Sequence, residues 1–306
     1  MNGKHNAGIV GGLIAVLLTT VILTASPSPA ANDGPAVTGV AGDELHVMTF
    51  NLRYASDTPP NSWPERRPVM QQLLLQERPD IIGTQEGLYQ QLRDIESDLP
   101  AYYDSVGQGR DGGSRGEAMQ IFYDSRRLRP LDYDHYWLSD TPDVVGSKTW
   151  GGCCPRMVTW IRFADERTGD QFYVLNTHLE AFDATARSKS ADLILRRMAE
   201  DFDAALPVLM TGDFNEPARE GRTVYDRLVT DGPMVDTWVT AKERTALYAT
   251  FHGYRPLIAN GDRIDWILST PGVEARYAAI NTFSKQGQFP SDHLPVQAVV
   301  TLPDAG

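Results

Sequence analysis

Residues 207–215 read PVLMTGDFN, a short apolar run followed by an aspartate, a phenylalanine and an asparagine. The apolar part predicts a buried β-strand over 207–211, so that Asp213 and Asn215 lie just beyond its end. Strand-like runs elsewhere end in the same manner, in Asn51, Glu86, His178, Asp265 and the pair Asp292 and His293. One such residue would usually mark a turn or a solvated surface, and a lone histidine is more often packed than catalytic. Their recurrence predicts that folding gathers carboxylates, amides and imidazoles at one edge.

Around these runs, strands and helices alternate from Glu44 onward. The sequence predicts a helix over 62–78. Ser62 and Glu65 can form a capping box, Pro64 suits the first turn, and Pro79 ends the helix. Further helices are expected at 88–99 and 184–202, a hairpin at 157–163 and 171–178, and strands at 45–54, 80–85, 118–123, 264–268 and 295–302. Long loops at 104–116, 139–156 and 241–262 are expected to shape a substrate site or to be mobile. The pattern predicts one α/β domain of sheets packed face to face with helices outside.

The first residues differ from the rest. Lys4 and His5 precede an apolar run over about 8–25, and Ser-Pro-Ser-Pro-Ala-Ala follows at 26–31. This order favours a secretory signal peptide over 1–30, although the run is also long enough for an uncleaved membrane anchor. We therefore expect a signal peptide at 1–30, a linker at 31–43 and a catalytic domain at 44–306 in a secreted protein, with anchoring to the membrane as the alternative.

Charge and cysteine content narrow the function. With 28 Lys and Arg against 40 Asp and Glu, the chain has a formal net charge of −12. An acidic protein is not built for long-range attraction to nucleic acid or anionic lipid, which counts against a nuclease without excluding one. The two cysteines, Cys153 and Cys154, are adjacent, so they form a vicinal disulfide or remain free thiols, and a cysteine-based zinc site is not expected.

The order of the motifs resembles the endonuclease/exonuclease/phosphatase superfamily, to which deoxyribonuclease I-like phosphohydrolases belong. The resemblance covers about residues 45–302. It implies a four-layer α/β sandwich of two packed mixed β-sheets flanked by helices, and a metal-dependent enzyme that hydrolyses phosphoric esters. The motifs that carry it are Thr49-Phe50-Asn51-Leu52-Arg53, Gly83-Thr84-Gln85-Glu86, Asn176-Thr177-His178-Leu179, Gly212-Asp213-Phe214-Asn215, Arg263-Ile264-Asp265-Trp266-Ile267 and Ser291-Asp292-His293.

The same resemblance implies residue roles. Glu86, with Asn51 and Asp292 close by, would bind Mg²⁺, with Mn²⁺ or Ca²⁺ as alternatives; oxygen ligands suit such hard ions. Asp213 would hold or deprotonate the attacking water, and Asn215 would steady that water or a phosphate oxygen. Asp265 would orient His293 and favour its imidazolium, which leaves both Asp213 and His293 as candidates for the general base.

Three further residues complete the implied site. His178 would join His293 in neutralising phosphoryl oxygens. Glu117 would orient His178, as Asp265 orients His293. Arg156 would give a planar, permanently charged phosphate contact.

The substrate is less constrained than the chemistry. The expected substrate is a small phosphodiester or phosphomonoester, such as a sugar phosphate or lipid head group; the alternative is DNA or RNA, and a remote one is a binding protein without activity. Nucleic acid and membrane lipid stay open as partners, and no obligate protein partner is indicated. Aromatic residues in or beside loops either line a pocket or anchor the loops; they are Trp63, Trp150, His252 and Tyr254.

Overall fold

The computed structural model describes residues 1–3 and 36–303. Contacts divide the chain into residues 1–30 and 31–306; of the first unit only residues 1–3 are described, and they form no helix or strand. Residues 4–30 of the expected signal peptide and residues 31–35 of the expected linker thus lie outside the described residues. Within the described residues, no helix is long and apolar enough to cross a membrane.

The second unit alternates strands and helices. The longer elements are β1 (Glu44–Asn51), α1 (Trp63–Glu77), β2 (Ile81–Gln85), α2 (Tyr89–Asp98), β5 (Leu128–Trp137), β6 (Met157–Asp165), β7 (Gln171–His178), α3 (Ala184–Asp201), β8 (Val208–Asp213), β11 (Asp265–Ser269), β12 (Glu274–Ile280) and β13 (Val296–Thr301). The shorter ones are β3 (Tyr103–Val106), β4 (Ile121–Asp124), α4 (Thr223–Tyr225), the π-helix η1 (Asp226–Thr230), β9 (Val235–Asp236), α5 (Thr237–Thr240) and β10 (Glu243–Arg244).

The strands form two mixed sheets. One has the order β10-β12-β13-β1-β2-β4-β3 and the other β5-β6-β7-β8-β11-β9. Each sheet contains a central parallel pair, β1 with β2 and β7 with β8, while their other neighbours run antiparallel. Parallel strands end at the same edge of a sheet, so the residues that close these four strands lie near one another within each sheet.

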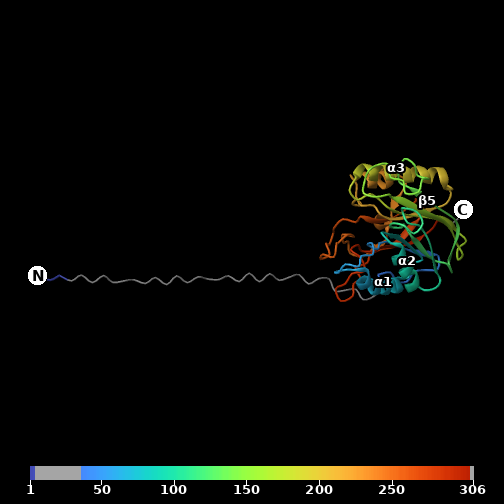
Figure 1. Ribbon diagram of the computed structural model, residues 1–306. Coiled ribbons are helices and arrows are strands. Elements are labelled where there is room, and N and C mark those ends of the chain that lie inside the picture. The colour runs from blue at the N-terminus through green and yellow to red at the C-terminus, as the bar shows by residue number, and fades with distance from the viewer. Residues whose placement is uncertain (4–35, 304–306) are drawn as a thin grey trace. The chain divides into compact units, whose positions relative to one another are not determined.

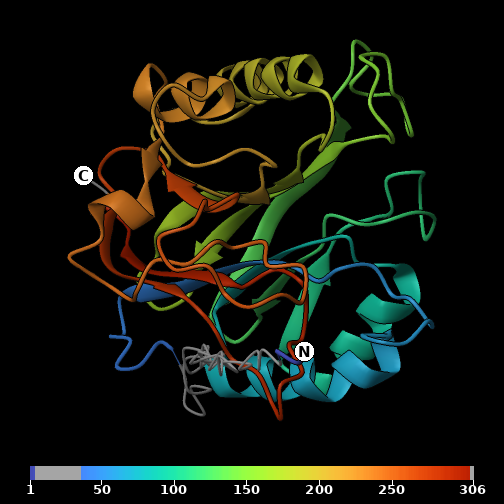
Figure 2. The same cartoon turned by 90° about the vertical axis from the view of Figure 1, so that its left-hand side faces the viewer.

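Three buried layers of apolar side chains hold the sheets and helices together. Side chains alternate along β1: Leu45 and Val47 pack between the two sheets, whereas Met48 and Phe50 pack under α1 and α2. A third cluster joins the second sheet to α3. Figure 1 and Figure 2 show the result, with α3 over one sheet and α1 and α2 over the other. The expected four-layer α/β sandwich is confirmed.

Two segments outside the longer elements are held in place by buried ionic side chains. Residues 36–43, expected as linker, form no regular element, yet Ala36 and Val37 donate backbone hydrogen bonds to the buried carboxylate of Glu77 at 2.6 and 3.3 Å. Arg127, in the turn before β5, is fully buried and donates two hydrogen bonds to Asp165. The arginine thereby ties the turn before β5 to the end of β6.

Candidate active site

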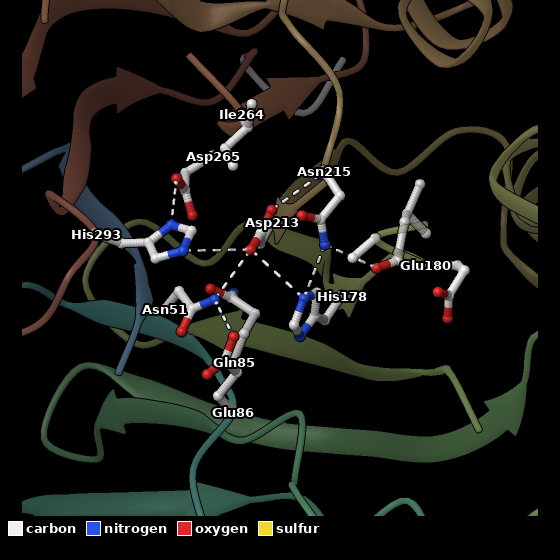
Figure 3. Close-up of polar contacts among 12 residues, drawn as sticks. Asn51, Gln85, Glu86, His178, Glu180, Asp213, Asn215, Ile264, Asp265 and His293 are labelled. Carbon is white, nitrogen blue, oxygen red and sulfur yellow. Dashed lines mark hydrogen bonds and ion pairs between the residues drawn. The ribbon is translucent and has the colours of Figure 1, made fainter. Parts of the chain in front are cut away.

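The polar residues that end the strands meet at one place because of the sheet register. Asn51 pairs with Gln85 across β1 and β2, so Glu86 follows immediately beside Asn51. In the other sheet, Asp213 pairs with His178 across β8 and β7, and with Asp265 across β8 and β11. The face-to-face packing of the sheets then brings the two sets together, as Figure 3 shows.

Asp213 lies at the centre of the cluster. Its Oδ2 accepts a hydrogen bond of 2.9 Å from Asn51 Nδ2, and it lies 3.5 Å from His178 Nε2 and 3.9 Å from His293 Nε2. Its Oδ1 accepts the backbone N–H of Asn215 at 2.9 Å. Burial, with a smaller contribution from the Asp265 charge, raises the pKa of Asp213 to about 7. A carboxyl group with that pKa can gain or lose a proton near neutrality.

His293 has the opposite character. Its Nδ1 lies 3.0 Å from Asp265 Oδ2, and both residues are buried. Burial disfavours the charged imidazolium, but the carboxylates of Asp265, Asp213 and Asp292 outweigh it and raise the pKa of His293 to about 10. His293 is therefore a hydrogen-bond donor at neutral pH. The Asp265–His293 contact is the one that the resemblance implied.

His178 differs from His293 in its charge. Burial, together with the positive charges of Arg156, His293 and Arg110, lowers the pKa of His178 well below its ordinary value. The imidazole is therefore neutral, and it can form hydrogen bonds but not neutralise a phosphoryl oxygen. Asn215 Nδ2 lies 3.0 Å from His178 Nε2 and donates a second hydrogen bond to the Leu179 carbonyl.

The expected hydrogen bond between Glu117 and His178 is absent among the described residues. Glu117 instead accepts a hydrogen bond of 2.6 Å from Arg110 Nη1, and the Nδ1 atom of His178 has no hydrogen-bond partner. Sequence reasoning missed Arg110 because it lies in the loop after β3, where no periodicity fixes which side chains turn inward. The pairing makes Glu117 and Arg110 a polar unit of their own.

Arg156 is a second buried cation of the site, beside His293. Its side chain is 8% exposed, and its Nε lies 3.6 Å from Glu180 Oε2. Within the described residues, its Nε and Nη1 atoms are buried without a hydrogen-bond partner. Buried guanidinium N–H groups without acceptors are costly, so a bound anion such as phosphate would satisfy them.

The acidic end of the site fits a divalent cation. Ligand atoms of Glu86, Asp213 and His293 all lie within 4.8 Å of one another in the described part of the chain. Glu86 is half-buried and its Oε1 accepts a hydrogen bond of 2.9 Å from Asn51. Asp292, an expected ligand, lies outside that group and 3.9 Å from Arg53 Nε. The Glu86 carboxylate is a hard oxygen donor of the kind that Mg²⁺ or Ca²⁺ prefers, so Glu86 would hold such an ion, with Asn51 beside it.

Backbone conformation sets the direction of two of these side chains. Glu86 has φ 62° and Asn215 has φ 51°, both in the left-handed region. That region costs a non-glycine residue free energy, and such residues gather at functional sites. At Glu86 the turn follows β2 directly, so the side chain leaves the strand toward Asn51.

These residues surround one pocket of about 290 Å³. Glu86, His178, Asp213, Asn215 and His293 line it, together with Glu117 and Arg156 from the expected set. It is also lined by residues that were not predicted, namely Tyr54, Arg110, Cys153, Cys154, Ala181, Phe182, Phe251 and Ile264. Cys153 and Cys154 form a disulfide.

The aromatic residues proposed from the sequence lie away from the pocket; Trp63 joins α1 to α2, and Trp150 anchors a loop. Trp63 Nε1 donates to Asp94 at 2.8 Å, and Trp150 Nε1 donates to Asp140 at 2.6 Å. Neither tryptophan, nor His252 or Tyr254, is among the residues that line the pocket. Sequence alone could not separate Trp150, His252 and Tyr254 from Phe182 and Phe251, because all five belong to aperiodic segments.

Comparison with known proteins identifies a family and solved structures to which this chain is similar. The model of the Endonuclease/Exonuclease/phosphatase family matches residues 48–293. Among curated proteins none matches significantly. An endonuclease/exonuclease/phosphatase family protein from Bacteroides thetaiotaomicron is 33% identical, with a TM-score of 0.79 over 85% of this chain and 98% of that one.

Two further structures are also similar to this chain. A mannosyl-6-phosphatase from Bacteroides thetaiotaomicron is 34% identical, with a TM-score of 0.78 over 84% of this chain and 99% of that one. TDP2 from D. rerio, solved with a single-strand DNA product, is 16% identical, with a TM-score of 0.63 over 84% of this chain and 98% of that one. At that identity the second likeness shows the fold alone.

Proposed function

Since the chain belongs to the endonuclease/exonuclease/phosphatase family of phosphoester-hydrolysing enzymes, we propose that it is a secreted, Mg²⁺-dependent hydrolase of small phosphoesters. The observation that carries the proposal is the pairing of a buried acid, Asp213, with a buried cationic imidazole, His293, in a pocket that Arg156 also lines. Attack of water on a phosphoryl group needs a carboxylate to accept the proton of the water, a hydrogen-bond donor and a contact for the anionic oxygens, and this pocket holds all three.

In the proposed reaction, Asp213 is the general base. Its pKa of about 7 lets its carboxylate accept the proton of the attacking water, whereas His293, with a pKa of about 10, is already protonated. The new P–O bond forms to the water oxygen as the P–O bond to the substrate alcohol breaks. That alcohol leaves with the bonding electrons and takes a proton from solvent.

Charge that develops on the phosphoryl group is met by the chain's own donors. The imidazolium Nε2–H of His293 and the buried N–H groups of Arg156 donate to phosphoryl oxygens. Asn215 holds the water or an oxygen near Asp213. Enzymes of this family generally depend on a divalent metal, and a bound ion at Glu86 would polarise the phosphoryl group.

A sugar-linked phosphomonoester is the favoured small substrate. The 34% identity to a mannosyl-6-phosphatase supports it, and the pocket of about 290 Å³ has room for a phosphate and a small group. The net charge of −12 disfavours a long polyanion such as DNA or RNA. Secretion rests on the signal-like residues 1–30 alone.

Phosphate release from mannose 6-phosphate, run beside cleavage of plasmid DNA, tests the proposal. With Mg²⁺ the purified chain should release phosphate, and EDTA should stop the release. Asp213→Asn should lower the rate by about 10²-fold or more. The matched control Asp231→Asn, at an exposed residue outside the pocket, should keep it. Plasmid cleavage that depends on Asp213, without phosphate release, would establish the nuclease instead.

A further inference from the structure

The mouth of the pocket is unusually rich in exposed rings. Phe182 is 86% exposed, Tyr54 49% and Phe251 44%, and all three line the pocket that holds Asp213. They belong to separate loops, after β7, after β1 and before β11. A single exposed ring needs no explanation, but apolar side chains that gather from three loops around a polar centre mark a ligand-binding surface.

The disulfide continues the apolar wall beside Phe182. Cys153 is exposed and Cys154 half-buried, and both line the same pocket. The preceding Gly151 and Gly152 have φ 85° and 75°, and a Cβ on Gly152 would lie 2.6 Å from the Glu180 carboxylate. The chain must therefore pass close over Glu180 before it reaches the two cysteines.

Glu180 connects this wall to the phosphate end of the site. Its buried carboxylate accepts the backbone N–H of Cys153 at 3.2 Å and that of Phe182 at 3.1 Å. The same carboxylate lies 3.6 Å from Arg156 Nε. One buried acid thus fixes the disulfide, the backbone of the exposed ring and the anion-binding arginine relative to one another.

The remaining wall is polar and carries donors and acceptors side by side. The side chains of Arg110 and Glu117 are 15% and 17% exposed, and their ion pair lines the pocket. Arg110 Nε has no hydrogen-bond partner among the described residues. A guanidinium next to a carboxylate can bind two neighbouring hydroxyl groups: the guanidinium donates a hydrogen bond to one hydroxyl, and the carboxylate accepts a hydrogen bond from the other.

We propose that these walls form a subsite for the leaving group of the substrate, and that its ligand is a pyranose sugar. A pyranose presents C–H groups on its faces, which suit Phe182 and the disulfide sulfurs, and hydroxyls at its edge, which suit Arg110 and Glu117. A nucleobase would use the rings but has no adjacent hydroxyls of its own, and an acyl chain would form no hydrogen bond with Arg110 or Glu117. The proposal rests on the proposed phosphoesterase function, because a leaving-group subsite presupposes ester cleavage in this pocket.

The kinetic test compares a sugar with a non-sugar ester. For Phe182→Ala, kcat/KM on mannose 6-phosphate should fall about ten-fold more than kcat/KM on glycerol 3-phosphate. The matched control Tyr133→Ala, a similarly exposed ring on β5 outside the pocket, should leave the ratio of the two unchanged. An equal fall on both esters would overturn the subsite while leaving phosphoester hydrolysis established.

A binding test separates the subsite from catalysis. Saturation-transfer NMR of methyl mannoside with the Asp213→Asn protein should show contacts to ring protons of the sugar, and adding Phe182→Ala should remove them. The double variant Cys153→Ser/Cys154→Ser, which lacks the disulfide, should weaken them. Sugar contacts without turnover of any phosphoester by the unmodified chain would refute the proposed function alone. Turnover without sugar contacts would refute the subsite.

Discussion

Replacing His46 by glutamine should make the fold more resistant to acid. His46 lies on β1 and is 3% exposed, and its Nε2 is 2.6 Å from Gln297 Oε1 on β13. Burial lowers the pKa of His46 from 6.5 to about 4, because the charged imidazolium would lose its hydration between the strands. The unfolded chain therefore binds a proton at a pH where the folded protein does not.

The sign and size follow from linkage. The neutral state of His46 supports the fold fully above pH 6.5, and this contribution is lost as the pH falls from 6.5 toward 4. With those two pKa values, the loss is about 2 kcal/mol at pH 5 and about 3 kcal/mol at pH 4. A glutamine does not titrate, and its amide can still donate to Gln297.

Urea unfolding followed by tryptophan fluorescence provides the assay, since the chain has 6 tryptophans. The free energy of unfolding should be measured at pH 7.5 and pH 5 for both proteins. The fall between the two pH values should be about 2 kcal/mol smaller in His46→Gln, whatever the variant costs at neutral pH. An equal fall in both proteins would refute the assignment of acid sensitivity to this histidine.

Three other changes test the supports of the site. Arg66 is fully buried and donates hydrogen bonds to the carbonyls of Asn61, Leu52, Pro290, Arg53 and Tyr54. Arg66→Met removes these donors and should therefore lower the free energy of unfolding by about 3 kcal/mol or more. Urea titration measures this change, and an unchanged midpoint would contradict it. Glu86→Gln should raise the Mg²⁺ concentration for half-maximal phosphate release at least about ten-fold, and an unshifted metal titration would remove Glu86 from the ligands. Asp265→Asn should lower kcat by about 10²-fold or more, because His293 loses the carboxylate that favours its imidazolium. The near-ultraviolet circular dichroism should be preserved, which shows that the fold is intact. Near-normal turnover would rule out a role of Asp265 in keeping His293 charged.

Much of the fold was predictable because its central strands are buried on both faces. Val208–Asp213 is buried throughout, so its sequence is apolar until the polar residues at its end. β5 was missed for the opposite reason. It is an edge strand whose Arg129, Asp132 and Asp134 are exposed, and an exposed edge has the composition of a loop.

The candidate site was predictable as a set of residues but not as a set of contacts. Strand ends predicted that Asp213, His178 and Asp265 gather at one edge, and the family resemblance implied the contact between Asp265 and His293. The partner of Glu117 and the neutral state of His178 depend instead on how the loop of Arg110 folds over the pocket, and on burial beside Arg156. Such loop contacts are between residues far apart in sequence and leave no periodic signal.

The central claim is that water attacks a phosphoryl group beside Asp213 and His293. Its most direct test is hydrolysis of mannose 6-phosphate in water enriched in the isotope oxygen-18. Phosphorus NMR of the released phosphate and mass spectrometry of the sugar then locate the label. We expect the label to enter the phosphate and not the sugar, and we expect His293→Ala to release almost no phosphate. Label in the sugar, or full release by His293→Ala, would contradict it.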